Sequence, residues 1–164
     1  WRNRGGNASR APINPRLSKD QMMSNITATL TSGMRVSLSN GRHEWMADEP
    51  IALGGTDTGP NPYELLLASL AACTCITLSY YCQRKGIALE SVNASYDFDR
   101  VHADDCKDCD DSRSGFIDRI TSHVEIKGSF DDAERKRLAE IVERCPVHKT
   151  LGNGVAFADN AIFP

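Results

Sequence analysis

Residues 61–86, NPYELLLASLAACTCITLSYYCQRKG, carry the clearest helix signal in the chain. Asn61 suits the N-cap, Pro62 the first helical position, and Glu64 the third position, where its side chain completes a capping box. Gly86 is typical of the residue that ends such a helix. Leu, Ala and Ile cover nearly all of its surface, which predicts a helix buried in the centre of a domain or against a partner subunit.

Alternating polar and apolar side chains predict strands on both sides of this helix. Residues 25–47 alternate in this way and contain the Asn40-Gly41 pair, a strong hairpin signal, so two or three antiparallel strands are expected there. Residues 88–101 and 116–130 form two further alternating segments and predict a strand pair. Strands, a central helix, strands and further helices in this order indicate an α+β fold.

The C-terminal third is expected to hold two helices and a strand. Asp131 begins a second capping box, which predicts a helix up to Arg144 with one apolar face. A Cys-Pro pair opens a short helix over 145–152, and VAFADNAIF at 155–163 predicts a last strand.

Length and charge limit the class of protein. A chain of 164 residues is long enough to bury a core, and one domain over residues 22–164 is the expected organisation. Residues 1–21 contain several Arg and no apolar h-region, and are interpreted as a leader or an added segment outside the core. The net charge of −3, with Lys and Arg spread along the chain, argues against a nucleic-acid partner. The longest apolar stretch is broken by Ser and Thr, which argues against a membrane partner.

Six cysteines without a secretory signal predict reduced thiols in the cytoplasm, where any disulfide is functional and transient. Cys73 lies in the middle of the predicted helix, where a free cysteine by itself is most often a small buried hydrophobe. Cys75 and Cys82 lie about two helical turns apart, and a place in the core is expected for both.

Cys145 has the stronger physical argument for a reactive thiol. Pro146 places it at the N-terminus of a helix, where unpaired N–H groups favour an anionic sulfur, so an accessible thiolate is predicted. His148 and Lys149 follow about one turn later and add positive charge. The alternative is a cysteine that serves as a small cap before a helix begun by proline.

An acidic loop offers a separate pair of thiols. Cys106 and Cys109 have metal-ligand spacing and supply half of a tetrahedral zinc site, which His102 and an Asp would complete. The alternative is an ordinary acidic loop. Another polar set is interpreted as a strand end and a turn in contact with solvent rather than as a site: His43, Asp48 and Glu49.

Two motifs together resemble the osmotically inducible protein C and organic hydroperoxide resistance (OsmC/Ohr) family. They are NPYELLLASLAAC at 61–73 and CPVHKTL at 145–151. The segments DEPIALGGTDTGP at 48–60, RKGIALE at 84–90 and HADDCKDC at 102–109 are similar to one OsmC-like branch. The resemblance implies an OsmC-like fold with a central buried helix on antiparallel sheets, and an intertwined homodimer whose active sites lie at the interface.

The resemblance also implies a cysteine-based hydroperoxide reductase that acts in oxidative-stress defence. In that family the first cysteine, here Cys73, attacks the O–O bond of an organic hydroperoxide or H₂O₂. The second, here Cys145, resolves the sulfenic acid as a disulfide, and an external dithiol reopens that disulfide without a cofactor. The alternative is a non-catalytic OsmC-like dimer that binds a small apolar or sulfur-containing ligand in its interface cleft.

The chain departs from the family's peroxidases at two charged positions. Their arginine upstream of the first cysteine has no matched position, since no Arg lies between Arg42 and Arg84, and Arg42 is the candidate to replace it. Their glutamate follows Asn-Pro directly, where this chain has Tyr63, with Glu64 one residue later. Glu64 is either a cap or a site residue. On a continuous helix it lies on the side opposite Cys73 and about 13 Å along, so a site role requires a second copy or a break in the helix.

Overall fold

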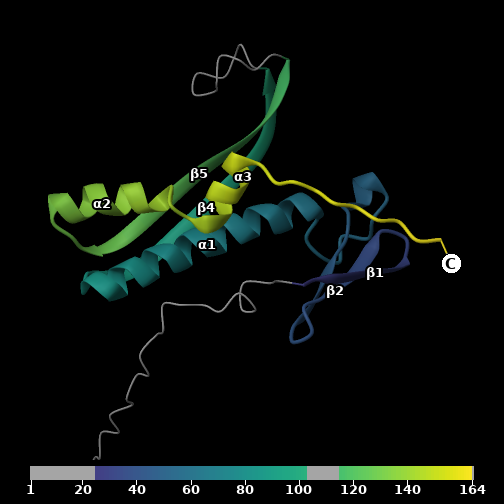
Figure 1. The fold of residues 1–164 in the computed structure, drawn as a ribbon, viewed down its shortest axis with the longest axis horizontal. Helices are drawn as coiled ribbons and strands as arrows, with labels where there is room; N and C mark the ends of the chain where they lie inside the picture. Colours follow the sequence, from purple (N-terminus) through teal and green to yellow (C-terminus); the bar gives the residue numbers. More distant parts are fainter. Residues whose placement is uncertain (1–24, 103–114, 164) are drawn as a thin grey trace, which may run out of the picture. The chain divides into compact units, whose positions relative to one another are not determined.

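The computed structural model describes residues 25–102 and 115–163 (Figure 1). The chain forms two compact units, an N-terminal unit that ends at Gly59 and a C-terminal unit that begins at Pro60. Antiparallel sheets occur in both units and the long helices in the second, which confirms the predicted α+β class.

The N-terminal unit holds one antiparallel sheet with the strand order β1 (Thr27–Ser32), β2 (Arg35–Ser39) and β3 (Glu44–Ala47). The turn between β2 and β3 depends on Asn40. Its side-chain oxygen accepts hydrogen bonds from the backbone N–H groups of Arg42 and His43, at 3.0 and 2.8 Å. Gly41 adopts a φ of 82°, which a residue with a side chain rarely takes. The Asn-Gly hairpin is therefore confirmed.

The segment after β3 is organised around Asp48, which is only 2% exposed. Its carboxylate accepts hydrogen bonds from the backbone N–H groups of Glu49, Thr56 and Thr58, and from both threonine hydroxyls. These donors hold the pKa of Asp48 well below its usual value, the Thr56 hydroxyl most of all. The interpretation of Asp48 as part of a solvated turn is wrong, because five donors compensate the cost of burying its charge.

The C-terminal unit consists of α1 (Pro62–Lys85), β4 (Ala88–His102), β5 (Phe116–Ser129), α2 (Asp132–Val142) and α3 (Pro146–Asn153). Both predicted capping boxes are present, the first at Asn61 and the second at Asp131. Gly86 ends α1 in the left-handed conformation, with a φ of 71°. The local signals for these helices and strands are thus confirmed to within about two residues, the usual scatter of element ends.

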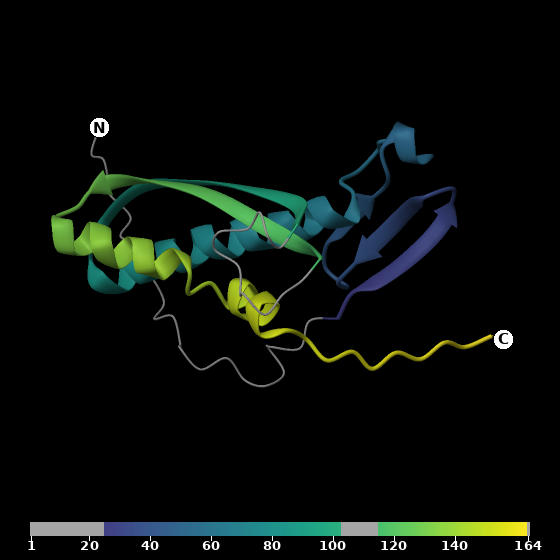
Figure 2. The same ribbon diagram turned by 90° about the horizontal axis from the view of Figure 1, so that it is seen from above.

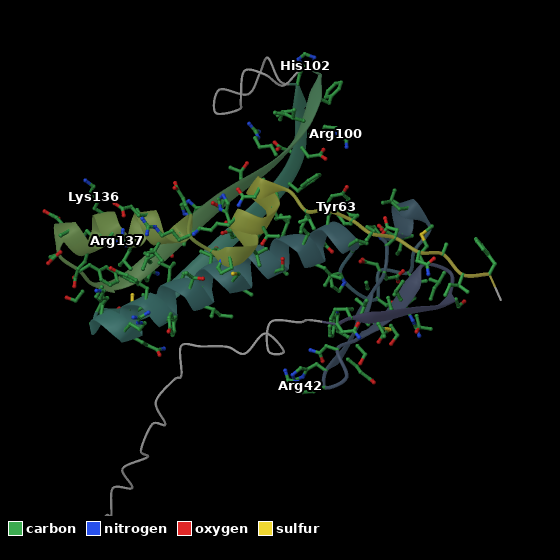
Figure 3. The ribbon with its side chains drawn as sticks, viewed as in Figure 1. Arg42, Tyr63, Arg100, His102, Lys136 and Arg137 are labelled. Carbon is green, nitrogen blue, oxygen red and sulfur yellow. The ribbon has the colours of Figure 1, made fainter. Side chains whose placement is uncertain are left out.

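β4 and β5 form one long twisted ribbon that runs along α1 (Figures 1 and 2). The strands pair from Ala88 opposite Ser129 to His102 opposite Phe116, with one irregularity near Leu89. Figure 3 shows Arg100 and His102 toward the end of the ribbon away from α2. Near this end the guanidinium of Arg100 pairs with Asp118 on the opposite strand at 2.9 Å.

The core of the C-terminal unit lies between α1, α2 and the ribbon. Its fully buried members are Leu78 and Cys82 of α1 with Leu138 and Ile141 of α2. Burying each leucine contributes about 1.5–3 kcal/mol relative to leaving it exposed. The prediction of a core position is therefore confirmed for Cys82. Arg137 of α2 also lies over the ring of Tyr81, 5.9 Å from its centroid.

The opposite face of α1 is not covered by the described residues of the C-terminal unit. The buried residues of α1 form one stripe, Leu70, Thr74, Leu78 and Cys82, whereas Ile76 is 67% exposed. By length and composition alone α1 would also be able to cross a membrane, a test that core helices of soluble proteins pass as well. The helix was predicted to be buried in the centre of a domain or against a partner subunit, and the described residues of its own unit bury one stripe of it.

The predicted last strand is wrong. Residues 154–163 have no regular secondary structure. Their large apolar side chains are exposed: Val155, Phe157, Ile162 and Phe163. A β-strand needs a neighbouring strand to accept and donate its backbone hydrogen bonds, and no strand in the described part of the chain pairs with this segment.

Candidate active site

Cys73 of α1 and Cys145, which precedes α3, are neighbours in the C-terminal unit. The side chain of Cys145, the backbone N–H of Val147 and the hydroxyl of Thr77 all lie close enough to Cys73 to act on the pKa of its thiol. Both cysteines are free thiols. Cys73 is half-buried and Cys145 is fully buried. The fold therefore brings together two thiols that are far apart in the sequence.

Two local arrangements hold the thiols in place. Thr74, the residue after Cys73, is buried, and its hydroxyl lies 2.8 Å from the hydroxyl of Tyr96, which ties α1 to β4. Cys145 is the N-cap of α3, and its side chain makes no capping hydrogen bond. Pro146 lacks an N–H, so the first free backbone donor of α3 is the N–H of Val147. This N–H acts on the Cys73 thiol and lowers its pKa.

Burial dominates the electrostatics of Cys73. It raises the pKa of this thiol above the ordinary value of 9.0, and the hydrogen bond and charge of Cys145 raise the pKa further. The Val147 N–H and the Thr77 hydroxyl act in the opposite direction. The resting site consequently holds Cys73 mainly as a neutral thiol. The predicted accessible thiolate at Cys145 is wrong, because the fold closes over that sulfur completely.

Glu64 and Arg42 were the charged candidates for the site. Glu64 serves the capping box, where its carboxylate accepts the Asn61 N–H at 2.7 Å. Arg42 lies in the N-terminal unit at the turn between β2 and β3 (Figure 3). A catalytic part for either residue stays a prediction.

The zinc prediction also remains open. Cys106 and Cys109 lie outside the described residues. His102 ends β4 and contacts the Phe116 ring edge-on, with 5.4 Å between ring centroids. Within residues 25–102 and 115–163, no three His, Cys, Asp or Glu side chains are grouped as metal ligands.

Two cavities lie near the cysteine pair. One of about 270 Å³ is enclosed by α1, β4, β5 and α3; its lining includes Leu70, one turn before Cys73, as well as Tyr96 and His148. The other, of about 540 Å³, lies between β5, α2 and α3. Ser122 and His148 belong to both linings, so the cavities adjoin. No role was predicted for Thr74 and Tyr96, because their contact joins α1 to β4 and no sequence motif links the two positions.

The β4–β5 ribbon packs on a long apolar helix, α1. One thiol lies on this helix, and a second directly precedes a helix begun by proline. These features define a class of α+β protein with a two-cysteine site. The chain belongs to the OsmC family: the family model described as OsmC-like protein matches residues 55–158. This confirms the family indicated by the two sequence motifs.

Solved structures share the fold of this chain. The OsmC-like protein of Mycoplasma pneumoniae is 25% identical with a TM-score of 0.60, over 79% of this chain and 87% of that one. An organic hydroperoxide resistance protein OsmC of Legionella pneumophila is 22% identical with a TM-score of 0.55, over 77% and 87%. The organic hydroperoxide resistance protein OhrB of Bacillus subtilis is 23% identical with a TM-score of 0.52, over 78% and 89%. None of the curated proteins matches the chain.

The raised pKa of Cys73 predicts a slow, alkaline-shifted reaction with iodoacetamide. Only the thiolate is alkylated, so the rate at Cys73 should increase with pH and level off only above the ordinary value of 9.0. Peptide mapping by mass spectrometry after timed alkylation between pH 6 and pH 11 measures this profile for each cysteine. A midpoint for Cys73 below about 8 would contradict the electrostatics described above.

Proposed function

We propose that this protein is a thiol peroxidase that reduces organic hydroperoxides through Cys73 and Cys145. The observation that carries the proposal is the contact between the half-buried Cys73 thiol and the buried Cys145 sulfur. A disulfide requires two sulfurs that can approach to about 2.05 Å, and the folded chain already brings these two close enough to interact. Membership of the OsmC family and the structural likeness to hydroperoxide resistance proteins support the same reaction.

The first step is oxidation of Cys73. Its thiolate attacks the terminal oxygen of R–O–O–H, so that an S–O bond forms and the O–O bond breaks. The bonding electron pair leaves on the alkyl oxygen, which takes up a proton and becomes an alcohol. The sulfur loses two electrons and becomes a sulfenic acid. The Val147 N–H stabilises the thiolate, and a thiolate of high pKa is intrinsically a strong nucleophile.

Resolution by Cys145 completes the oxidative half of the cycle. The Cys145 sulfur attacks the Cys73 sulfur, an S–S bond forms, and hydroxide leaves as water with the proton of the Cys145 thiol. An external dithiol then reduces this disulfide by two thiol–disulfide exchanges. Cys73 is the more exposed of the two sulfurs and is the expected point of attack. A protein that works with reduced thiols fits the cytoplasm, where we expect it to act.

We also propose that the working unit is a homodimer in which a second copy covers α1. The uncovered face of α1 includes Ala72 and Ile76, and beside it lies a hollow of about 400 Å³ lined by Cys75, Ile76, Ser79, Tyr80 and Gln83. An apolar face of this kind is typical of a helix that packs against a partner. The exposed apolar side chains of residues 155–163 add to the surface that a second copy would bury.

Replacing Ile76 by aspartate is expected to raise the dissociation constant of this dimer at least about 100-fold, because the interface would bury an unpaired carboxylate. Sedimentation velocity over a concentration series measures the constant. Ala133→Asp, an exposed position on α2, is the matched control and should leave the dimer intact. A dimer that is equally stable in both variants would exclude the α1 face as the interface.

A second candidate function is a non-catalytic dimer that binds a small apolar or sulfur-containing ligand. The raised pKa of Cys73 favours it, since a mainly neutral thiol is a weak nucleophile at neutral pH. Consumption of cumene hydroperoxide in the presence of dithiothreitol separates the two functions. The peroxidase predicts turnover well above the rate of dithiothreitol alone, whereas no acceleration, with both thiols unchanged, supports the ligand-binding protein.

A further inference from the structure

His148 occupies a special position next to the cysteine pair. It lies in the first turn of α3, directly after Val147, whose backbone N–H donates to the Cys73 sulfur. Its side chain lines the cavity of about 270 Å³ together with Leu70, which lies one turn before Cys73 on α1. A hydroperoxide in this cavity would therefore lie beside the imidazole of His148 and against Leu70, one helical turn from Cys73.

The proposed reaction needs a proton at this place. When the thiolate attacks the terminal peroxide oxygen, the alkyl oxygen departs as an alkoxide, which is a strong base and a poor leaving group. A positioned proton donor commonly accelerates such a step by about 10²–10⁴-fold.

The other polar side chains that line this cavity are less suited to the task. The Tyr96 hydroxyl is engaged with the Thr74 hydroxyl at 2.8 Å. Asp118 is paired with Arg100 at 2.9 Å. Ser122 carries an aliphatic hydroxyl, which does not release a proton near neutral pH. Imidazole is the side chain that both holds and gives up a proton between pH 5 and pH 8.

We infer that His148 is the general acid of the peroxidase reaction and gives its proton to the departing alkoxide as the O–O bond breaks. This inference rests on the proposed function. Protons balance within the site, because the thiol proton of Cys73 replaces the proton that His148 delivers. The net reaction converts a thiol and a hydroperoxide into a sulfenic acid and an alcohol. The Nε2 or Nδ1 atom of His148 supplies the proton, and no further oxidant or reductant enters this step.

The test compares two oxidants with different leaving groups on the full-length protein. tert-Butyl hydroperoxide releases an alkoxide that needs a proton, whereas peracetic acid releases acetate, which leaves without one. Oxidation of Cys73 is followed by rapid quench, thiol blocking and peptide mass spectrometry in the wild type, His148→Gln and a matched control. The control is His123→Gln, the same exchange at an exposed position of β5 outside both cavities.

For His148→Gln we expect the rate constant with tert-butyl hydroperoxide to fall about 100-fold and the constant with peracetic acid to stay within about twofold. His123→Gln should match the wild type with both oxidants. An unchanged rate of Cys73 alkylation by iodoacetamide would show that the variant keeps an intact site, and His148→Asn is the second variant if His148→Gln does not fold.

Two outcomes would overturn the inference: an equal loss with both oxidants, which indicates a structural role, or no loss with tert-butyl hydroperoxide. Failure of the proposed function looks different, because the wild-type Cys73 would then remain reduced with the alkyl hydroperoxide. If the wild type and His148→Gln react with tert-butyl hydroperoxide at the same rate, only the role of His148 as proton donor is excluded, and the proposed peroxidase function stands.

Discussion

Cys73→Ser is expected to lower the rate of cumene hydroperoxide consumption at least about 1,000-fold, because a serine hydroxyl is not a nucleophile of comparable strength at neutral pH. In the proposed reaction, the Cys73 sulfur is the atom that receives the peroxide oxygen. The fold should survive the exchange, since Cys73 is half-buried and serine differs from cysteine only in having an oxygen in place of the sulfur. A coupled assay of peroxide loss with dithiothreitol measures the effect.

Cys75→Ser is the matched control, two residues further along the same helix and half-buried as well. Cys75 lines the hollow on the uncovered face of α1 and has no part in the proposed cycle. Its variant should keep the wild-type rate. Comparable turnover in Cys73→Ser and the wild type would end the peroxidase account, and a loss in Cys75→Ser alone would move the nucleophile to the other thiol.

Cys145→Ser is expected to separate the two halves of the cycle. The first oxidation of Cys73 should proceed within a few-fold of the wild-type rate, but steady-state turnover with dithiothreitol should fall about 100-fold or more, because the sulfenic acid lacks its resolving thiol. Dimedone trapping followed by mass spectrometry should find sulfenic acid at Cys73 in this variant after one equivalent of peroxide. The wild type should give almost no dimedone adduct.

Burial of Cys145 requires a second variant, since serine places an unpaired hydroxyl in a site that is fully closed. Cys145→Ala lacks that hydroxyl and should give the same result in both halves of the cycle. Full turnover in Cys145→Ala, or a dimedone adduct as small as that of the wild type, would contradict a resolving role for Cys145.

The parts of the fold that local chemistry decides could be predicted from the sequence. The capping boxes at Asn61 and Asp131, the stop at Gly86 and the hairpin at Asn40 depend on residues within a few positions of one another. The burial of Asp48 could not be predicted in this way, since it depends on how donors eight and ten residues later fold back onto one carboxylate.

Two further predictions that differ from the structure concern apolar segments that the described part of the chain leaves exposed. The segment 155–163 has the alternation of a strand, yet no strand among the described residues pairs with it. The apolar surface of α1 likewise exceeds what the described residues of the C-terminal unit cover, as the exposed Ile76 shows. Both surfaces point to the same proposed second copy.

The candidate site was only partly accessible to sequence reasoning. The approach of Cys73 to Cys145 followed from the family resemblance, because two positions so distant in the chain carry no spacing signal of their own. Local helix chemistry placed Cys145 correctly before α3 but wrongly predicted it to be accessible, since its burial depends on distant packing. His148 was noted only for its charge, and its place in the cavity wall emerged from the packing of α3 against β5 and α1.

One experiment tests the central claim most directly. The reduced protein is treated with one equivalent of cumene hydroperoxide, free thiols are then blocked, and the peptides are mapped by mass spectrometry. The account predicts a single new disulfide between Cys73 and Cys145, a protein mass lower by two hydrogens, and recovery of both thiols after dithiothreitol. If both cysteines stay alkylatable while the peroxide is consumed, or if the disulfide forms elsewhere, the two-thiol mechanism is contradicted.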